Sequence, residues 1–557
     1  MRTRTLLTVL TAGLVVLIHI GADALRAQAP GPAVLTGTVS SVEEGNMEGV
    51  LVTLRRTDAP FTVTVVSDGQ GRYSFPKSHL EPGQYSVRIR AIGYDLETQG
   101  PVTITSNSPA TVDLRLRKTK DLAAQLTTLD WNTSVPGTPE QKRGLVRCGF
   151  CHTFERVARS KYTADEWLPV IQRMSTYYSD GTNHRRFQRR QVGPPPAPAA
   201  PTAAQKAQAQ YLATINLSQS DTWSYPLKTF PRPTGRATRV IVTEYDFPRP
   251  TTVIHDLDVD SQGNVWYGDA GWLFLGRLDT KTATFTEYPI PGFMPKNPIG
   301  VLDVHFDKQD NLWVAMMMQG SKVMKFDTKT LEPTFWDIPE PEDGRYRRVA
   351  FLMPFYSDVD GKVWATDAGQ YVFRLDAGTG KMEVFSVFDD VPGEGHRIYQ
   401  VTADAQNNGY FLDAGAANIG RVDAQTGEVT LYPVPTPNSF PRRGIFDAQN
   451  RLWFGEFNAD RIGMFDPRTE RIREWVVPTP YWSPYFASGD MNGDVWVSGN
   501  QADRVMRLDP ESGDIINYLM PGYTDTRKIA FDRSTDRVRF WLPNKGNATL
   551  IRVEPLD

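Results

Sequence analysis

The sequence is poor in cysteine, in net charge and in long apolar segments. Its 557 residues include two cysteines, which excludes the disulfide framework that stabilises many small secreted domains. The formal net charge is −3, without the basic excess typical of nucleic-acid-binding proteins, so we expect no nucleic acid partner. Beyond the N-terminal segment, no apolar run approaches the ~20 residues that a transmembrane helix needs, so we expect no membrane span after processing.

The N-terminal residues have the order of a secretory signal peptide. Arg2 and Arg4 precede a mainly apolar run over 6–20, and small residues at 22, 24, 27 and 29 form two candidate cleavage sites. We assign 1–29 to a signal peptide and expect an exported protein, in the periplasm or on the cell surface of a bacterium. An uncleaved membrane anchor is the alternative.

Both cysteines stand in one pentapeptide, Cys148-Gly149-Phe150-Cys151-His152. Cys-x-x-Cys-His is the attachment signature of c-type haem, in which two thiols add to the vinyl groups and the histidine ligates the iron. We therefore expect one haem c, bound covalently by Cys148 and Cys151, with His152 as the proximal iron ligand. A small disulfide or a redox cysteine pair is the alternative.

Residues 121–225 are predicted to form a small all-α domain around this motif. Thr163 and Glu166 have capping-box spacing before an apolar stripe, although Pro169 should kink that helix or delay its start. Another helix is expected over 203–217. The Tyr-Leu pair at 211–212 resembles the last helix of small c-type cytochromes, and this resemblance implies a cytochrome c-like haem domain.

The distal iron ligand must come from a short list within this domain. Met174 lies on the apolar stripe of its predicted helix, and a thioether ligand would raise the reduction potential relative to two histidines. His184 lies in an arginine-rich loop before the last helix and is the alternative. We slightly favour Met174, and an open sixth position is the third choice.

Residues 30–120 are predicted to form a small antiparallel β-sandwich. Apolar and polar residues alternate over 85–90 and 111–116, and turn residues separate such runs at 67–71 and 81–83. The order of the segments GVLVTL, SDGQGRYSF and PGQYSVRIRAIGY resembles the carboxypeptidase regulatory-like domain. The resemblance implies a structural or docking module, and we find no catalytic residues in it.

Residues 239–557 repeat with a period of 43 to 51 residues. Each unit carries a large aromatic residue, most often after a turn: Trp266, Trp313, Trp364, Tyr410, Trp453, Trp496 and Phe540. Repeats of this length built from short strands indicate a β-propeller, here with seven blades. The stretch 240–245 should complete the last blade by pairing with 550–553. The whole chain is therefore predicted to be mainly β.

The repeat around Arg451–Gly463 resembles the streptogramin B lyase (virginiamycin B lyase) family. Those enzymes open a cyclic ester by a metal-assisted elimination, so the resemblance implies Mg²⁺ at the propeller if this chain acts in the same way. Glu456 matches the family glutamate. The position fourteen residues earlier holds Arg442, where the family has a histidine, and this departure argues against lyase activity.

Other polar residues are expected at the same channel mouth. His255 occupies the corresponding position of the first repeat. Comparable strand entrances hold His396, Tyr399, Arg443 and Tyr485. The candidate catalytic residues are therefore His255, His396, Arg442 and Glu456. The alternative is that these side chains form a hydrogen-bonded lining of the channel.

Three functions remain open from the sequence. The first is an exported haem c protein that transfers electrons, with a propeller that binds a small-molecule substrate or a redox partner protein, and it could be an oxidoreductase. The second is a lyase that acts on a cyclic ester. The third is a non-catalytic binding protein of the cell surface.

Overall fold

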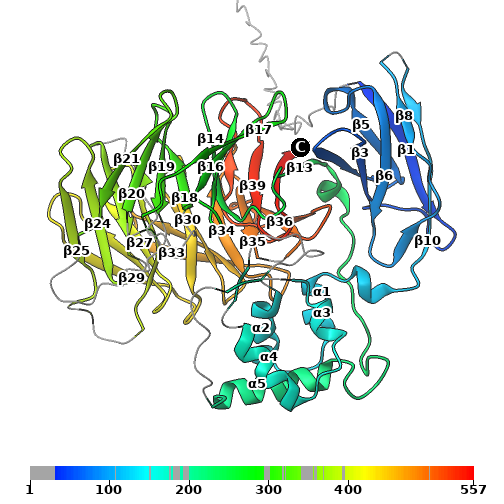
Figure 1. The fold of residues 1–557 in the computed structure, drawn as a ribbon, viewed down its shortest axis with the longest axis horizontal. Coiled ribbons are helices and arrows are strands. Elements are labelled where there is room, and N and C mark those ends of the chain that lie inside the picture. The colour runs from blue at the N-terminus through cyan, green and yellow to red at the C-terminus, as the bar shows by residue number, and fades with distance from the viewer. Residues whose placement is uncertain are drawn as a thin grey trace, which may run out of the picture.

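The computed structural model describes most of the chain (Figure 1): residues 32–106, 108–149, 152–174, 177–179, 189–191, 200–293, 301–316, 319, 322–339, 355–356, 360–367, 369–389, 391, 395–500 and 502–557. The fold is mainly β, with 43% strand and 12% helix. The segment predicted as a signal peptide, together with Cys151 and His184, lies outside the described residues. Among the described helices, none combines the length and the apolar character needed to cross a membrane.

The N-terminal β domain consists of two sheets that share one hydrophobic core. The first sheet contains β1 (Ala33–Ser41), β2 (Gly45–Asn46), β5 (Arg72–Pro76), β7 (Tyr94–Leu96), β9 (Ala110–Thr111) and β10 (Leu114–Lys118). The second contains β3 (Leu51–Arg56), β4 (Phe61–Val66), β6 (Gly83–Arg90) and β8 (Val102–Ile104), and the short helix η1 (Lys77–His79) follows β5. The prediction of a wholly antiparallel sandwich is wrong, because β1 runs parallel to both β9 and β10. Parallel strands need a long connection, and the chain from β2 to β8 provides it between β1 and β9.

The helical segment follows this domain and has a core of its own. It contains η2 (Leu122–Gln125), α1 (Thr128–Ser134), α2 (Pro139–Leu145), η3 (Val146–Gly149), α3 (Glu155–Ala158), α4 (Ala164–Met174) and α5 (Ala203–Ile215). Trp131, Phe154, Trp167 and Leu212 are buried together in its core. Capping boxes fix the starts of α1, α2 and α5, so local sequence explains where these helices begin.

Two features of the helical segment differ from the prediction. The segment is not all-α, because β11 (Tyr177–Ser179) and β12 (Arg189–Gln191) pair as a two-stranded sheet. Pro169 does not delay the start of α4, which begins five residues earlier at Ala164. Packing of Trp167 and Ile171 against the core stabilises the helix although the proline removes one backbone donor.

The C-terminal region contains seven four-stranded antiparallel blades, as the aromatic repeat predicted. The first three are β14 (Ile254–Val259), β15 (Val265–Asp269), β16 (Phe274–Asp279), β17 (Thr284–Pro289); β18 (Val301–Phe306), β19 (Asn311–Met316), β20 (Lys322–Asp327), β21 (Glu332–Asp337); and β22 (Phe355–Tyr356), β23 (Lys362–Thr366), β24 (Tyr371–Asp376), β25 (Met382–Ser386). The next three are β26 (Ile398–Ala403), β27 (Gly409–Asp413), β28 (Asn418–Val422), β29 (Val429–Pro433); β30 (Pro441–Phe446), β31 (Leu452–Glu456), β32 (Arg461–Asp466), β33 (Arg471–Val476); and β34 (Pro484–Gly489), β35 (Val495–Gly499), β36 (Arg504–Leu508), β37 (Ile515–Leu519). The seventh combines β38 (Ala530–Phe531), β39 (Phe540–Asn544) and β40 (Thr549–Pro555) with β13 (Val240–Asp246) from before the first blade.

A shared hydrogen bond explains the aromatic period. In four blades the indole N–H of the second-strand tryptophan donates to an aspartate six residues earlier, at 2.7 to 3.1 Å: Trp266 to Asp260, Trp313 to Asp307, Trp453 to Asp447 and Trp496 to Asp490. The aspartate lies in the turn between the first two strands and also accepts backbone N–H groups there. One carboxylate thus fixes both the turn and the ring in each of these blades.

Strand β13 joins the propeller to the N-terminal domain. One edge of β13 pairs with β40 along its whole length, from Val240 opposite Pro555 to Asp246 opposite Thr549, which confirms the predicted closure of the ring. Its other edge pairs with β4 of the N-terminal domain, through residues such as Val242 opposite Thr64. The result is a continuous eight-stranded sheet that extends from blade seven into the sandwich (Figure 1).

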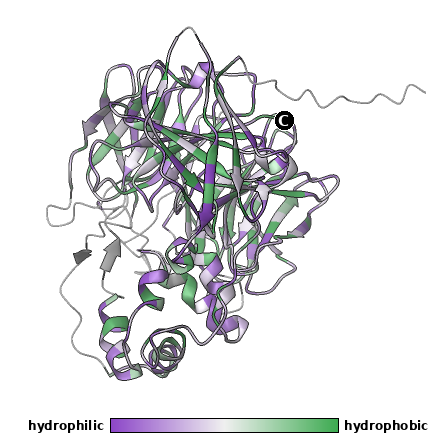
Figure 2. Ribbon diagram, turned by 90° about the vertical axis from the view of Figure 1, so that its right-hand side faces the viewer, coloured by the Kyte–Doolittle hydropathy of each residue, from purple (hydrophilic) through white to green (hydrophobic). Residues whose placement is uncertain are grey.

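The helical segment packs on one face of the propeller, which we call the helix-bearing face. Arg143 of α2 donates to Asp460 at 2.9 Å, in the turn between β31 and β32. Leu129 of α1 packs with Trp453 and Trp482 of the propeller. In the hydropathy view the strands of the β region and the helices below them both carry hydrophobic and polar residues (Figure 2). Asp460 lies in the turn between the second and third strands of its blade, at the end of the blade where the innermost strand begins. The helix-bearing face therefore also carries the opening of the central channel, which we call the channel mouth.

Replacing Asp307 by alanine should lower the free energy of unfolding by about 1 to 3 kcal/mol, because the Trp313 indole and two turn N–H groups lose their acceptor. Asp307→Asn keeps one acceptor oxygen and should lose less. Chemical denaturation followed by tryptophan fluorescence measures both. Equal losses in the two variants would contradict the role assigned to the hydrogen bonds.

Candidate functional site

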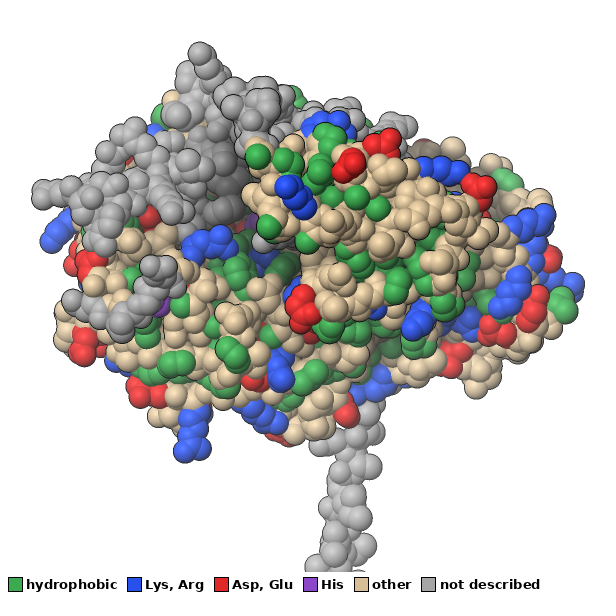
Figure 3. Space-filling view, turned by 90° about the horizontal axis from the view of Figure 1, so that it is seen from below, with side chains coloured by type: hydrophobic (Ala, Val, Ile, Leu, Met, Phe, Trp, Pro, Cys, Tyr) green, Lys and Arg blue, Asp and Glu red, His purple; other side chains and the backbone are tan. Residues whose placement is uncertain are grey.

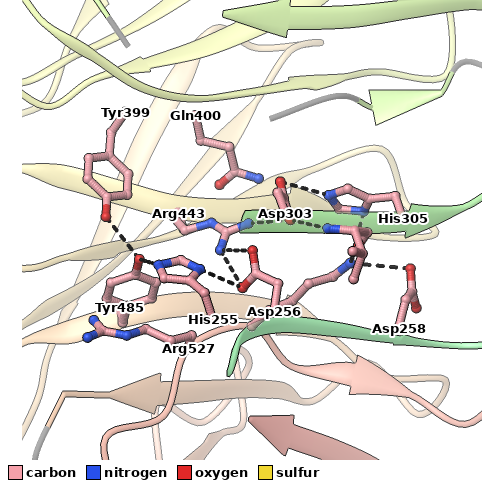
Figure 4. Close-up of polar contacts among 12 residues, drawn as sticks. His255, Asp256, Asp258, Asp303, His305, Tyr399, Gln400, Arg443, Tyr485 and Arg527 are labelled. Carbon is pink, nitrogen blue, oxygen red and sulfur yellow. Dashed lines mark hydrogen bonds and ion pairs between the residues drawn. The ribbon is translucent and has the colours of Figure 1, made fainter. Parts of the chain in front are cut away.

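The innermost strands bring buried polar side chains together along the propeller axis (Figure 4). At their centre is Arg443 of β30, whose side chain is fully buried. Its guanidinium donates two hydrogen bonds to Asp256 of β14, at 2.8 and 2.7 Å, and one to Asp303 of β18, at 3.0 Å. This cluster links blades one, two and five through a single side chain.

The two carboxylates of this cluster differ in their protonation. Burial raises the pKa of Asp256 to about 7, and the negative charge of Asp303 adds to the rise, although Arg443 opposes it. Burial acts on Asp303 as well, but His305 and Arg443 outweigh it and hold the pKa of Asp303 well below its ordinary value. Asp303 is therefore the ionised partner of Arg443 near neutral pH.

The polar chain continues away from the helix-bearing face. His305 Nε2 lies 3.2 Å from Asp303, and Lys528 Nζ lies 3.0 Å from His305 Nδ1 and 3.2 Å from Asp258. An ammonium only donates, so Nδ1 of His305 is the acceptor and Nε2–H points to Asp303. This assignment gives both ring nitrogens of His305 a partner.

A second chain runs from the cluster to the channel mouth. Arg442 donates to the Tyr399 hydroxyl at 3.0 Å, the Tyr399 and Tyr485 hydroxyls are 2.9 Å apart, and Tyr485 lies 3.0 Å from His255 Nε2. Because arginine only donates, the assignment that gives each of these three contacts one donor and one acceptor points each proton inward, from Tyr399 to Tyr485 and from Tyr485 to His255. His255 Nδ1 then faces Asp256, 3.2 Å away.

The charges around this chain shift two pKa values. Burial opposes ionisation of the Tyr399 phenol, but the positive charge of Arg442 and the hydrogen bond with Tyr485 outweigh it and lower the pKa of Tyr399. Burial, together with the positive charges of Arg527 and Arg443, lowers the pKa of His255 well below 6.5. His255 is therefore a neutral imidazole that can accept a proton only if this environment changes.

The structure brings two of the four candidate catalytic residues into one hydrogen-bonded chain, His255 and Arg442. His396 lies apart from it: its Nδ1 is 2.7 Å from Asp413, and its ring stacks on Phe388 with centroids 4.5 Å apart. These two contacts account for the position of His396. Glu456, the fourth candidate, has no described contact with Arg442.

Glu456 is a buried carboxyl group at the end of β31. Neither of its oxygens has a hydrogen-bond partner among the described residues, whereas Asp269, at the same position of blade one, accepts three backbone N–H groups. Burial, assisted by the neighbouring Glu474, raises the pKa of Glu456 to about 8. The side chain is therefore mostly protonated at neutral pH.

The haem motif is described in part. His152 is half-buried, its Nδ1 lies 3.0 Å from the Thr153 carbonyl oxygen, and burial lowers its pKa, which favours the neutral imidazole that ligates metals. Cys148 packs against the core of the helical segment, and Met174 is the half-buried last residue of α4. Among the described residues, no three His, Cys, Asp or Glu side chains cluster closely enough to hold a metal ion, and the Mg²⁺ expectation stays a prediction.

The haem motif lies on the helix-bearing face, next to the channel mouth. The Tyr523 hydroxyl, from the loop before β38, donates to the Gly149 carbonyl within the motif at 2.8 Å. Val146, two residues before the motif, belongs to one continuous hydrophobic cluster with Tyr399, Phe457 and Tyr485. Seen from below, a recess opens near the centre of this face, with hydrophobic and basic side chains at its edge (Figure 3).

Sequence reasoning placed Arg443 at an inner-strand entrance but missed its partners Asp256, Asp303, His305 and Lys528. A signal was present, because charged residues stand at alternate positions of first strands that should be apolar, as in His255-Asp256-Leu257-Asp258. Buried charges need partners, so such residues on several inner strands imply contact across the axis.

Family models match two parts of the chain. Residues 34–117 match the carboxypeptidase regulatory-like domain. Residues 354–528 match the virginiamycin B lyase family. Both matches confirm resemblances seen in the sequence, one for the N-terminal domain and one for blades three to six of the propeller.

Solved structures give similar propellers. A streptogramin B lyase structure is 20% identical, covers 58% of this chain and 100% of its own, and has a TM-score of 0.49. Virginiamycin B lyase from Staphylococcus aureus is 19% identical, with coverage of 57% and 99% and a TM-score of 0.49. The extracellular domain of a hybrid two component system from B. thetaiotaomicron is 14% identical, with coverage of 56% and 39% and a TM-score of 0.43. Comparison with curated proteins finds no match.

Glu456→Gln should remove a pH-dependent loss of stability. The folded protein keeps this carboxyl protonated up to a pKa of about 8, whereas an unfolded glutamate ionises near 4.3. Wild-type stability relative to the variant should therefore fall as the pH rises between these values, by roughly 3 to 4 kcal/mol from pH 5 to pH 8. Chemical denaturation at the two pH values measures the difference. The exposed Glu332→Gln should show none, and an unchanged Glu456→Gln difference would contradict the raised pKa.

Proposed function

We propose that the protein is an exported haem c protein whose propeller mouth binds a small molecule beside the haem and takes electrons from it. The observation that carries this proposal is the contact of the described part of the motif with the propeller. The Tyr523 hydroxyl donates to the Gly149 carbonyl oxygen, and Val146 belongs to the same hydrophobic cluster as Tyr399 and Tyr485. The motif alone suggests a cofactor. Its contacts with the propeller support the further proposal that the cofactor acts on a molecule bound at the mouth.

The residues of the helical segment fit a haem. Cys148 and Cys151 would hold it covalently and His152 would ligate the iron, with Met174 or His184 on the other side. The indole N–H groups of Trp131 and Trp167 and the amide of Asn132 are buried without a hydrogen-bond partner among the described residues. Buried donors without acceptors are rare, and the carboxylates of a bound haem would act as acceptors for these groups. When bound, the haem supplies a one-electron acceptor.

The residues at the mouth can prepare a substrate for oxidation. Arg442 and the aromatic side chains around it bind and orient a molecule from the solvent side. The Tyr399–Tyr485–His255 chain offers a path for a proton released there, with Asp256 next to His255 Nδ1 as the final acceptor. Removal of the proton along one path and of electrons along another fits an oxidoreductase, and the electrons would leave the haem to a redox partner protein.

The full chain, exported from a host with a cytochrome c maturation system, should carry haem that survives denaturing electrophoresis. The double variant Cys148→Ser, Cys151→Ser should lose it, because both thioether bonds are gone. His152→Ala should keep covalent haem with an altered spectrum. The far-red charge-transfer band of a methionine–iron bond should disappear in Met174→Ala and remain in His184→Ala. Absence of covalent haem in the wild type would reject the proposal.

The match of residues 354–528 to the virginiamycin B lyase family supports a second candidate, a lyase for cyclic esters. Arg442 speaks against it, because a guanidinium stays protonated and cannot act as a base. We expect no ring opening when the protein is incubated with a streptogramin B and Mg²⁺. Turnover that is lost in Glu456→Ala would make the lyase the leading candidate. Absence of both haem and turnover would leave a non-catalytic binding protein of the cell surface.

A further inference from the structure

Arg442 stands in a cage of aromatic side chains at the channel mouth. The guanidinium carbon is 4.1 Å from the ring centroid of Phe457, 4.5 Å from that of Tyr485, 4.7 Å from that of Tyr399 and 5.7 Å from that of Phe440. These rings fix the guanidinium in one place through cation–π contacts. The mouth therefore presents a positioned cation with apolar walls.

No carboxylate neutralises this cation within the described residues. Two buried arginines nearby are paired: Arg443 with Asp256 and Asp303, and Arg527 with Asp525. Arg442 donates one hydrogen bond, to the Tyr399 hydroxyl, and its buried Nε has no partner. A partly buried guanidinium with unused donors is an incomplete interaction, and an anion would complete it.

A second cation stands at the same mouth. Arg397 is exposed, and its guanidinium carbon lies 5.3 Å from the Phe440 ring centroid, on the ring that also faces Arg442. No carboxylate among the described residues forms an ion pair with it. Two arginines without a carboxylate partner among the described residues therefore stand at the mouth, Arg397 and Arg442.

We infer that Arg442 is an anion-binding residue, and that the mouth takes an organic anion whose carboxylate pairs with Arg442 while an aromatic or other apolar group packs against Phe440 and Phe457. A planar guanidinium matches a carboxylate through two parallel hydrogen bonds, and the rings give apolar surface next to them. The inference rests on the proposed function in one respect, since it names the substrate class of the same site. Phosphate shares the oxyanion chemistry, and the experiment below separates the two.

Titration calorimetry on the full-length protein with benzoate, methyl benzoate and inorganic phosphate tests the inference. Benzoate should bind, and added salt should weaken the binding because it is electrostatic. Methyl benzoate should bind at least about tenfold more weakly, since it keeps the ring and lacks the charge. Arg442→Gln should weaken benzoate binding by about tenfold or more, and Arg442→Lys by less, because the ammonium keeps the charge without the paired geometry.

The matched control is Arg468→Gln, an exposed arginine that pairs with Asp466 away from the mouth, and it should bind benzoate as the wild type does. Thermal unfolding verifies that each variant is folded. Absence of benzoate binding, equal binding by Arg442→Gln, or tighter binding of the methyl ester would overturn the inference. Binding of phosphate alone would overturn the assignment of an aromatic carboxylate.

The same titration on the haem-free double variant Cys148→Ser, Cys151→Ser separates this inference from the proposed function. Benzoate binding that depends on Arg442 in a protein without haem would support the anion site while the electron-transfer function fails. Covalent haem without benzoate binding would reject the anion site alone.

Discussion

Both edges of strand β13 are paired, and the arrangement of the three parts of the molecule depends on this. One edge closes the seventh blade against β40, and the other carries β4 of the N-terminal domain. The helical segment lies between β10 and β13, so one of its ends is held by the six-stranded sheet and the other by the eight-stranded sheet. Contacts such as Arg143 with Asp460 and Tyr523 with Gly149 then hold it on the helix-bearing face. The position of the haem motif at the channel mouth follows from this connection.

The propeller axis is organised by charge pairing, with one exception. Arg443 is balanced by Asp256 and Asp303, and Lys528 by Asp258, so the buried part of the axis satisfies its charges internally. Such clusters are sensitive to the loss of one partner, because the remaining charge stays buried. Arg442, next to Arg443 in sequence, is held by rings instead of carboxylates. Of these two neighbouring arginines on β30, Arg443 therefore stabilises the buried axis. Arg442 keeps donors for which the described residues provide no carboxylate.

Much of the fold could be predicted from the sequence, because its signals are local or periodic. The aromatic residues from Trp266 to Phe540 mark the second strands of the blades, and the capping pattern at Thr163 marks the start of α4. The parallel pairing of β1 and the contact of β13 with β4 could not be predicted, since edge pairing depends on which strands meet in space. The closure of β13 on β40 was predictable because the seventh repeat supplies only three strands, and the strand before the first repeat was available as the fourth.

The candidate site was predictable only in part, for the same reason. The Cys148–His152 motif is contiguous, so the haem prediction rests on five residues that can be read directly from the sequence. His255 and Tyr485 are 230 residues apart and meet only when the ring closes. The separation of His396 from this chain likewise needs coordinates, since a strand entrance does not say which way a side chain points.

The order of these parts along the chain has a consequence for biogenesis. The closing strand β13 is synthesised before any blade, and its partner β40 is made after the other six blades. The ring therefore stays open until β40 is available, and loss of β40 would undo blade seven and its link to the sandwich together. Cys148 also precedes all the blades. The propeller surface that contacts its segment therefore forms only after this residue has been made.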